Sequence, residues 1–230
     1  MVPVPAAGSR QRPSGYHSPL RARQAVETRR TVLNAATKLF AERGWAGTTL
    51  SAVAAEAGTA IETVYSAFRS KSGLLIAAID AAIVGDDDET PLVDRPEFAD
   101  LGTGALSERL TAATRIITMA LVRAVPLMGA LVEASACDVA AKARLDTYES
   151  DRRAVISYGL ELILGNSAPE ALVDSIWAIA GPEVFAKLTK ERQWSIETYQ
   201  SWLVEIGLAL LGQDFSERIR PRGGETARGK

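Results

Sequence analysis

The sequence contains very little of the chemistry on which disulfides, metal sites and acid–base catalysis depend. Its 230 residues include one cysteine, Cys137, and one histidine, His17. A lone cysteine excludes an internal disulfide and a thiolate-rich metal site, and its apolar neighbours predict a small buried side chain. The histidine lies in a proline-containing N-terminal stretch, far from any organised carboxylate pair. We therefore expect no enzyme activity, no metal and no cofactor.

Membrane segments and strands are also missing from the sequence pattern. No apolar run is long enough to suggest a bilayer span, and the N-terminus lacks the apolar centre of a secretory signal. We predict a cytoplasmic protein that makes no contact with a membrane. Strand-like alternation and fixed-period repeats are absent, whereas apolar residues recur at helical spacing. The expected fold class is all-α.

Charge is divided unevenly along the chain. Residues 1–75 contain ten Lys and Arg against four Asp and Glu, whereas the remainder contains sixteen against twenty-four. This asymmetry predicts an anionic partner at the N-terminal end, with a chance clustering of solvated charges as the alternative. Residues 1–24 are predicted to form a disordered arm whose arginines either enter a minor groove or only solubilise the chain. The acidic, proline-containing residues 85–104 predict an exposed loop.

Helical periodicity places a DNA-binding domain at residues 25–72. Apolar residues from Val32 to Phe40 form one helical stripe, which ends at Gly44. Thr48 is placed to cap a second helix that ends at Gly58, and a tight turn leads into a short third helix. Two helices joined in this way, over residues 49–68, form the geometry of a helix-turn-helix, which presents one helix to the major groove. The same geometry also occurs as ordinary core packing in all-α proteins.

The exposed side of the third helix and the neighbouring helix starts supply the candidate DNA contacts. Tyr65 can reach a phosphate or a base edge, and Ile61 can contact a thymine methyl. Glu62 either accepts a hydrogen bond from a cytosine amino group or points away from the groove. The predicted DNA-binding residues are Thr48, Thr49, Ile61, Glu62, Thr63, Tyr65, Ser66 and Lys71.

The segment RRTVLNAATKLFAERGWAGTTLSAVAAEAGTAIETVYSAFRSKSGLL resembles the DNA-binding domain of the TetR family of regulators. The resemblance extends over residues 28–84. The resemblance is carried by the GWAGTT entry to the second helix, the AG turn, the T-x-Y-x-x-F pattern and the SK entry to the fourth helix. Thr63, Tyr65 and Lys71 match the family's usual DNA-contact positions. The sequence departs from the family at Ala60, where a capping Ser or Thr is usual, at the Ile61–Glu62 pair and at Ala67.

The resemblance implies a homodimeric repressor that leaves a palindromic DNA operator when a small apolar effector binds. The implied architecture is an N-terminal three-helix DNA-binding domain followed by a larger helical ligand-binding and dimerisation domain over residues 73–213, with a disordered tail at 214–230. Its predicted helices cover 106–123, a new helix starting at Pro126, 138–164, 169–188 with a kink at Gly181–Pro182, and 195–211. An all-α ligand-binding or scaffold protein that has lost specific DNA binding is the alternative.

Two further sets of residues follow from the resemblance. Large or polar side chains on Ala-rich helices are the candidates for an effector pocket, with core packing or surface charge as the alternative for each. These ligand-binding candidates are Met119, Arg123, Met128, Tyr148, Arg152, Trp177 and Phe185. The predicted dimer interface, a four-helix contact across a two-fold axis, is formed by Leu172, Ile176, Ile179, Trp202, Leu203, Ile206 and Leu210.

Overall fold

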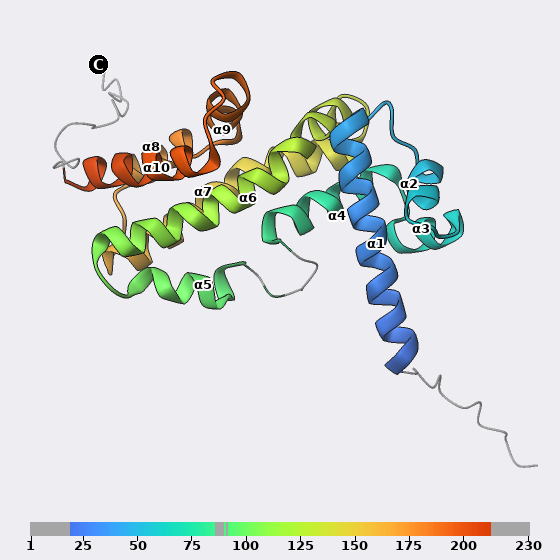
Figure 1. The fold of residues 1–230 in the computed structure, drawn as a ribbon, viewed down its shortest axis with the longest axis horizontal. Helices are drawn as coiled ribbons and strands as arrows, with labels where there is room; N and C mark the ends of the chain where they lie inside the picture. The colour runs from blue at the N-terminus through green and yellow to red at the C-terminus, as the bar shows by residue number, and fades with distance from the viewer. Residues whose placement is uncertain (1–18, 86–89, 91, 213–230) are drawn as a thin grey trace, which may run out of the picture.

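The computed structural model describes residues 19–85, 90 and 92–212, and this part of the chain contains helices and no strand (Figure 1). The all-α prediction is therefore confirmed. The α-helices are α1 (Pro19–Arg43), α2 (Leu50–Glu56), α3 (Ile61–Phe68), α4 (Lys71–Val84), α5 (Pro96–Ala99), α6 (Leu106–Ser135), α7 (Val139–Leu164), α8 (Glu170–Ile179), α9 (Pro182–Ala186) and α10 (Ile196–Leu211). Three short segments complete the set: the 3-10 turns η1 (Leu92–Asp94) and η2 (Asp100–Gly102) and the π-helical turn η3 (Lys187–Glu191).

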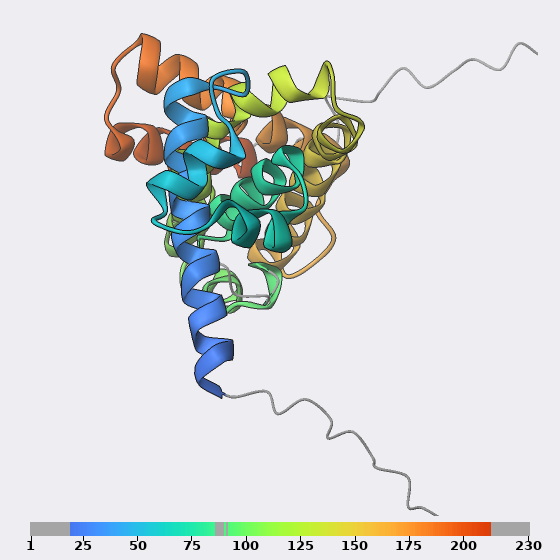
Figure 2. The same cartoon turned by 90° about the vertical axis from the view of Figure 1, so that its right-hand side faces the viewer.

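The long helices α6 and α7 lie side by side and connect the two ends of the molecule (Figure 1). Helices α1, α2 and α3 form one end, while α8, α9 and α10 form the other. Helix α4 joins the first group to α6, and the N-terminal half of α1 extends beyond the rest of the fold (Figure 2). This arrangement places the predicted DNA-binding helices at one end of the central helix pair.

A capping side chain and left-handed glycines mark several of the helix ends. Ser70 caps α4 by accepting a hydrogen bond from the Gly73 amide at 2.9 Å. Gly44, Gly58 and Gly165 follow the ends of α1, α2 and α7 with φ near +65°, +63° and +71°. Because a residue with a side chain is strained in this left-handed conformation, glycine ends these helices at little cost.

Two predicted helix boundaries are wrong. Helix α6 continues through Pro126, where a new helix was expected. The exposed proline removes one backbone hydrogen bond, but Leu121 and Leu127 on either side are buried, so core packing keeps the two halves in one helix. The predicted helix 169–188 is divided rather than kinked, since α8 ends before Gly181 and Pro182 occupies the first turn of α9.

The predicted exposed loop 85–104 also contains structure. Its second half forms η1, α5 and η2, which bury Phe98 and Leu101 against α6 and α7. Helix α1 begins at Pro19, so the predicted arm over 1–24 is helical from that residue. His17, the acidic residues 86–89 and the tail from 213 lie outside the described residues. Cys137 is exposed, contrary to prediction, because it lies in the turn between α6 and α7.

Helix α6 is long and apolar enough to cross a membrane by length and composition alone, which differs from the expectation that no such segment exists. In this fold it is the central helix, packed against α4, α7 and α10. Its apolar residues therefore have an explanation within the protein core, as in other central helices of helical proteins.

The DNA-binding helices do not have a core of their own. One hydrophobic cluster contains buried residues of α1, α2, α3 and α4 together with residues of α6, from Ala124 to Ala134, and Ala141 of α7. A shift of α6 along its axis would therefore disturb the packing beneath α2 and α3. This continuity provides a physical connection between the two ends of the molecule.

Candidate functional site

Helix α3 buries one face and exposes the other, as its periodicity predicts. Val64 and Phe68 are buried in the shared core, whereas Ile61 is 43% exposed and Tyr65 is 62% exposed. Glu62, Thr63 and Ser66 are also exposed, as are Ala60 and Ala67. A large apolar group and a tyrosine held in solvent on a short helix form a surface suited to contact with another molecule.

The start of α3 lacks a side-chain cap. Ala60 occupies the N-cap position and makes no capping hydrogen bond, so the departure noted in the sequence has a structural counterpart. At the start of α2, in contrast, the Thr49 hydroxyl accepts a hydrogen bond from the Ala52 amide at 3.1 Å. Thr49 is exposed, so it combines a capping role with access to solvent.

Thr48 has a different place from the one predicted. It is fully buried, and its hydroxyl donates to the carbonyl oxygens of Leu39 at 3.1 Å and Gly44 at 2.9 Å. The predicted capping and DNA-contact roles of Thr48 are therefore wrong, because its side chain faces the end of α1. Its neighbour Thr49 is the actual cap of α2.

Lys71 is committed to contacts inside the protein. Its Nζ donates a hydrogen bond to the carbonyl oxygen of Trp45 and lies 4.1 Å from the centroid of the Trp45 ring. Burial lowers the pKa of Lys71, while the carboxylate of Glu133 acts in the opposite direction. The side chain thus stabilises the α1–α2 loop, a role distinct from the phosphate contact predicted for it.

Sequence reasoning missed Glu133, which approaches the same loop from α6. One carboxylate oxygen accepts hydrogen bonds from the backbone amides of Trp45 at 2.9 Å and Ala46 at 3.4 Å. The loop before α2 is therefore held by Lys71 from α4 and by Glu133 from α6. No local pattern reveals this contact, because the partners are 88 residues apart in the sequence.

Arg29 is a second residue that the sequence analysis did not select. Its guanidinium lies over the Phe68 ring, 4.7 Å from the centroid, and the side chain is exposed. Together with Thr28 it faces Thr63 and Ser66 across a surface groove between α1 and α3. A cation beside the exposed face of α3 is well placed for a phosphate of a bound duplex. The basic cluster RR at 29–30 was a signal that could have pointed to it.

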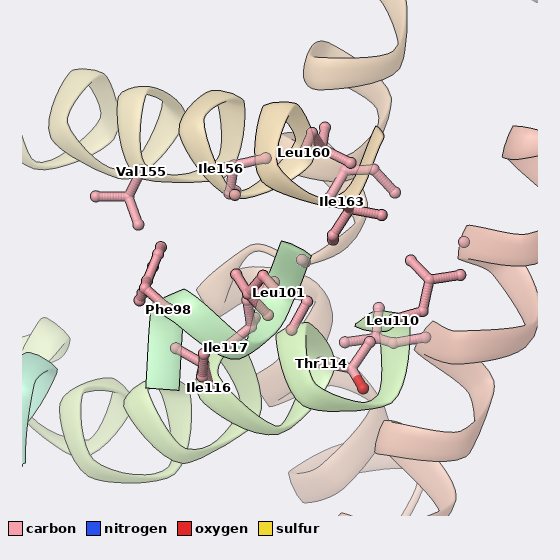
Figure 3. Close-up of a pocket in the computed structure, with 16 residues that line it drawn as sticks. Phe98, Leu101, Leu110, Thr114, Ile116, Ile117, Val155, Ile156, Leu160 and Ile163 are labelled. Carbon is pink, nitrogen blue, oxygen red and sulfur yellow. The ribbon is translucent and has the colours of Figure 1, made fainter. Parts of the chain in front are cut away.

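Two cavities lie between α6 and α7. The larger measures about 150 Å³ and the smaller about 80 Å³. Figure 3 shows the smaller one, with Ile156, Leu160 and Ile163 of α7 facing Ile117 of α6 and Leu101 of η2. Leu101 and Phe98 belong to the segment predicted as a loop. The three-residue spacing of these two apolar residues after Pro96 is a local signal for the short helical turns found there.

The structure brings only two of the predicted ligand-binding residues to these cavities. Tyr148 and Arg152 line the larger one. The other five lie elsewhere: Met128, Trp177 and Phe185 pack in hydrophobic clusters, and Met119 and Arg123 line a separate surface groove. Arg123 donates hydrogen bonds to the carbonyl oxygens of Ala82 and Ile83 at the end of α4.

The residues predicted for a dimer interface divide into two groups. Leu172 and Leu203 are buried inside the described chain, and Leu203 also lines the smaller cavity, so these two face inward. Ile176 lines the same cavity. The remaining four are partly buried: Ile179, Trp202, Ile206 and Leu210. Leu208, which was not predicted, is 40% exposed on α10.

The fold and the exposed face of α3 define an all-helical protein with an N-terminal helix-turn-helix. Residues 32–78 match the family model of bacterial regulatory proteins of the tetR family. Residues 32–78 therefore carry the pattern of the TetR family's DNA-binding domain, which confirms the resemblance seen in the sequence. The chain matches none of the curated proteins with which it was compared.

Solved structures with the same fold extend the similarity beyond that domain. A Rhodococcus sp. protein assigned to the TetR-family regulators covers 80% of this chain and 98% of its own, with TM-score 0.60 and 19% identity. A tetR-family transcriptional regulator from Streptomyces coelicolor covers 81% of both chains, with TM-score 0.59 and 21% identity. The multidrug binding protein EbrR, in complex with imidazole, covers 87% of this chain and 97% of its own, with TM-score 0.51 and 17% identity. At these identities the likeness establishes the fold.

Proposed function

We propose that this protein is a DNA-binding transcriptional regulator that places α3 in the major groove. The observation that carries the proposal is the exposed face of α3, with Thr63 and Tyr65 in solvent, within a domain that matches the tetR family. Thr49 and Arg29 flank this face and supply a hydroxyl and a cation for phosphates on either side. Phosphate contacts fix the position of a protein on DNA, and side chains in the groove select the sequence.

We further propose a homodimeric repressor that acts in the cytoplasm on a palindromic operator. A two-fold dimer presents two copies of α3 to two half-sites, so the symmetry of the protein matches that of the DNA. The contact surface is formed by the outer faces of α8 and α10, around Ile179, Trp202, Ile206, Leu208 and Leu210. Exposure of Leu208 and partial exposure of the other four support this choice.

Release from DNA is assigned to a small molecule that binds between α6 and α7. The two cavities in this region support the proposal, as does the similar fold of EbrR, a multidrug binding protein solved with imidazole. A ligand that favours one position of α6 shifts the population of states with a matching position of α2 and α3, because these helices share one core.

A ligand-binding or scaffold protein without specific DNA binding is the second candidate. It is favoured by the uncapped start of α3 at Ala60, by the exposed carboxylate of Glu62 and by the commitment of Lys71 to Trp45. Each of these features reduces the attraction of the α3 surface for phosphates.

Fluorescence anisotropy with a duplex from the chain's own promoter region, measured over a range of salt concentrations, separates the two candidates. A regulator shows sequence-specific binding that weakens steeply with salt. Tyr65→Ala is expected to weaken binding to all sequences about tenfold or more, whereas Tyr158→Ala, at another exposed tyrosine on α7, leaves binding within about twofold. Absence of any specific binding at low salt would favour the scaffold candidate.

Two further variants test individual contacts in the same assay. Arg29→Gln is expected to reduce the slope of log affinity against log salt by about one, because one phosphate contact is lost. Arg30→Gln is the matched control, since Arg30 is paired with Glu27 at 2.8 Å. Glu62→Ala is expected to change the preference among sequences; an equal loss on every sequence would show that Glu62 reads no base.

A further inference from the structure

The two cavities between α6 and α7 are neighbours that share part of their walls. The smaller lies toward α5, η2 and α10, and the larger toward the end of α4. The shared lining residues are Ile116, Ile117, Val155, Ile156 and Ala180. Because the same residues line both spaces, one elongated ligand can occupy both after a change of rotamer at this shared wall.

The smaller cavity offers a ligand only hydrocarbon contacts. Its labelled walls in Figure 3 are aliphatic or aromatic, apart from Thr114. The Thr114 hydroxyl already donates a hydrogen bond to the carbonyl oxygen of Thr111 at 3.1 Å. A polar group placed here would lose its water without gaining a partner, so this space suits an alkyl segment.

The larger cavity contains charged residues, but their charges are balanced within the protein. Arg152 pairs with Glu149 at 2.6 Å, and Arg144 pairs with Asp80 at 3.0 Å and with Asp151 at 3.5 Å. A charged ligand group would therefore meet no uncompensated charge among the described lining residues. Burying such a group is costly, whereas a neutral group avoids the cost.

Tyr148 supplies the free polar group of this cavity. The residue is 5% exposed and lines the larger space, and its hydroxyl has no hydrogen-bond partner among the residues that the structure describes. Burial raises the pKa of Tyr148, so the phenol keeps its proton at neutral pH and can donate it in a hydrogen bond. A donor on a residue that lines the cavity gains a partner when an oxygen of a bound ligand lies beside it.

We infer that the effector of the proposed regulator is an uncharged amphiphile, with an alkyl segment in the smaller cavity and a hydrogen-bonding oxygen at Tyr148. This inference rests on the proposed function and adds the chemical class of its ligand. An apolar cavity of about 150 Å³ holds a six-carbon ring, so the two spaces together accommodate about nine non-hydrogen atoms. A medium-chain alcohol has this size and chemistry.

Isothermal titration of the full chain with n-alkan-1-ols from butan-1-ol to dodecan-1-ol tests the size. Affinity is expected to rise about fourfold per added methylene as the alkyl segment fills the smaller cavity, to peak near octan-1-ol, and then to fall. Octanoate and octylammonium at pH 7 are expected to bind at least tenfold more weakly than octan-1-ol, because their charges find no partner.

Two variants test the placement of the ligand. Tyr148→Phe is expected to weaken octan-1-ol binding about tenfold and to leave binding of propylbenzene, which has no oxygen, within twofold. Gly159→Ala adds a methyl group that meets only Leu101 and Phe98 at ordinary contact distances of 3.7 and 3.9 Å, so it shortens the smaller cavity without a clash. The preferred alcohol is expected to become about one carbon shorter.

Gly129→Ala is the matched control for the second variant. This glycine lies in α6, and an added Cβ there meets nothing within 4 Å. Both alanine variants remove a helix-interior glycine and are expected to raise the melting temperature, but only Gly159→Ala is expected to change the chain-length optimum.

Three results would overturn the inference: no binding of any alcohol, tighter binding of octanoate or octylammonium than of octan-1-ol, or an identical optimum for Gly159→Ala and Gly129→Ala. A chain that binds its operator but no alcohol overturns this inference and leaves the proposed function standing. A chain that binds octan-1-ol with the expected optimum but shows no specific DNA binding overturns the proposed regulator role alone.

Discussion

Replacing Thr48 by valine separates a structural role from a DNA contact at the entry to α2. Thr48→Val keeps the branched shape of the side chain but removes the hydroxyl that donates to Gly44 at 2.9 Å and Leu39 at 3.1 Å. A buried carbonyl left without its donor costs about 1–3 kcal/mol, and the more apolar valine offsets part of this loss. We expect the free energy of unfolding to fall by about 1–2 kcal/mol.

Urea unfolding at a fixed protein concentration measures this change. With a urea dependence of roughly 3 kcal/mol per molar for a chain of this size, the midpoint is expected to fall by about 0.5 M. DNA affinity, measured where both proteins are folded, is expected to stay within about twofold. Thr49→Ala is the comparison: it removes an exposed cap, costs about 1 kcal/mol and also weakens DNA binding if this hydroxyl touches a phosphate. An unchanged midpoint with tenfold weaker DNA binding by Thr48→Val would refute the buried role.

Two further predictions concern the turn region of α6 and α7. Glu133→Ala is expected to lower the free energy of unfolding by no more than about 1 kcal/mol, since Glu133 is exposed, and to reduce the effect of a cavity ligand on DNA affinity. Glu133→Gln keeps an oxygen acceptor for the Trp45 amide. It is therefore expected to restore most of the stability and most of the ligand effect. The measurements are thermal unfolding and DNA anisotropy with and without octan-1-ol, and equal coupling in all three proteins would contradict the role of this contact. Asp138 caps α7 through the Ala141 amide, which holds the pKa of Asp138 below its ordinary value of 3.8. Its stabilising contribution is therefore present above that value and is lost as pH falls through the lower folded-state pKa. Asp138→Asn is expected to reduce the dependence of the free energy of unfolding on pH in this acidic range. An unchanged acid-unfolding curve would argue against a stabilising role for the Asp138 carboxylate.

Local chemistry made the N-terminal half of this protein largely predictable. The stripe from Val32 to Phe40, the left-handed glycines Gly44 and Gly58 and the cap Ser70 each act within one helix turn of their own position. A sequence pattern records such interactions directly, because helix capping and amphipathic periodicity involve residues three or four positions apart. The exposed face of α3 followed from the same periodicity.

Contacts between distant segments decided the rest. Thr48 and Thr49 are equally plausible caps in the sequence, and only the approach of the end of α1 buries the first and leaves the second in solvent. The sequence predicts Lys71 as a cation available to phosphate, whereas in the fold its ammonium group lies over the Trp45 ring.

The ligand region shows the same dependence on tertiary structure. Pro126 signals a helix start locally, yet core packing on both sides keeps α6 continuous. The smaller cavity exists because α6, α7 and the short helix around Phe98 do not fill the space between them. The sequence by itself determined the all-α class, the helices of the N-terminal region and its resemblance to the tetR family. Tertiary structure decided which polar side chains remain available, since burial and pairing depend on neighbours that are far apart along the chain.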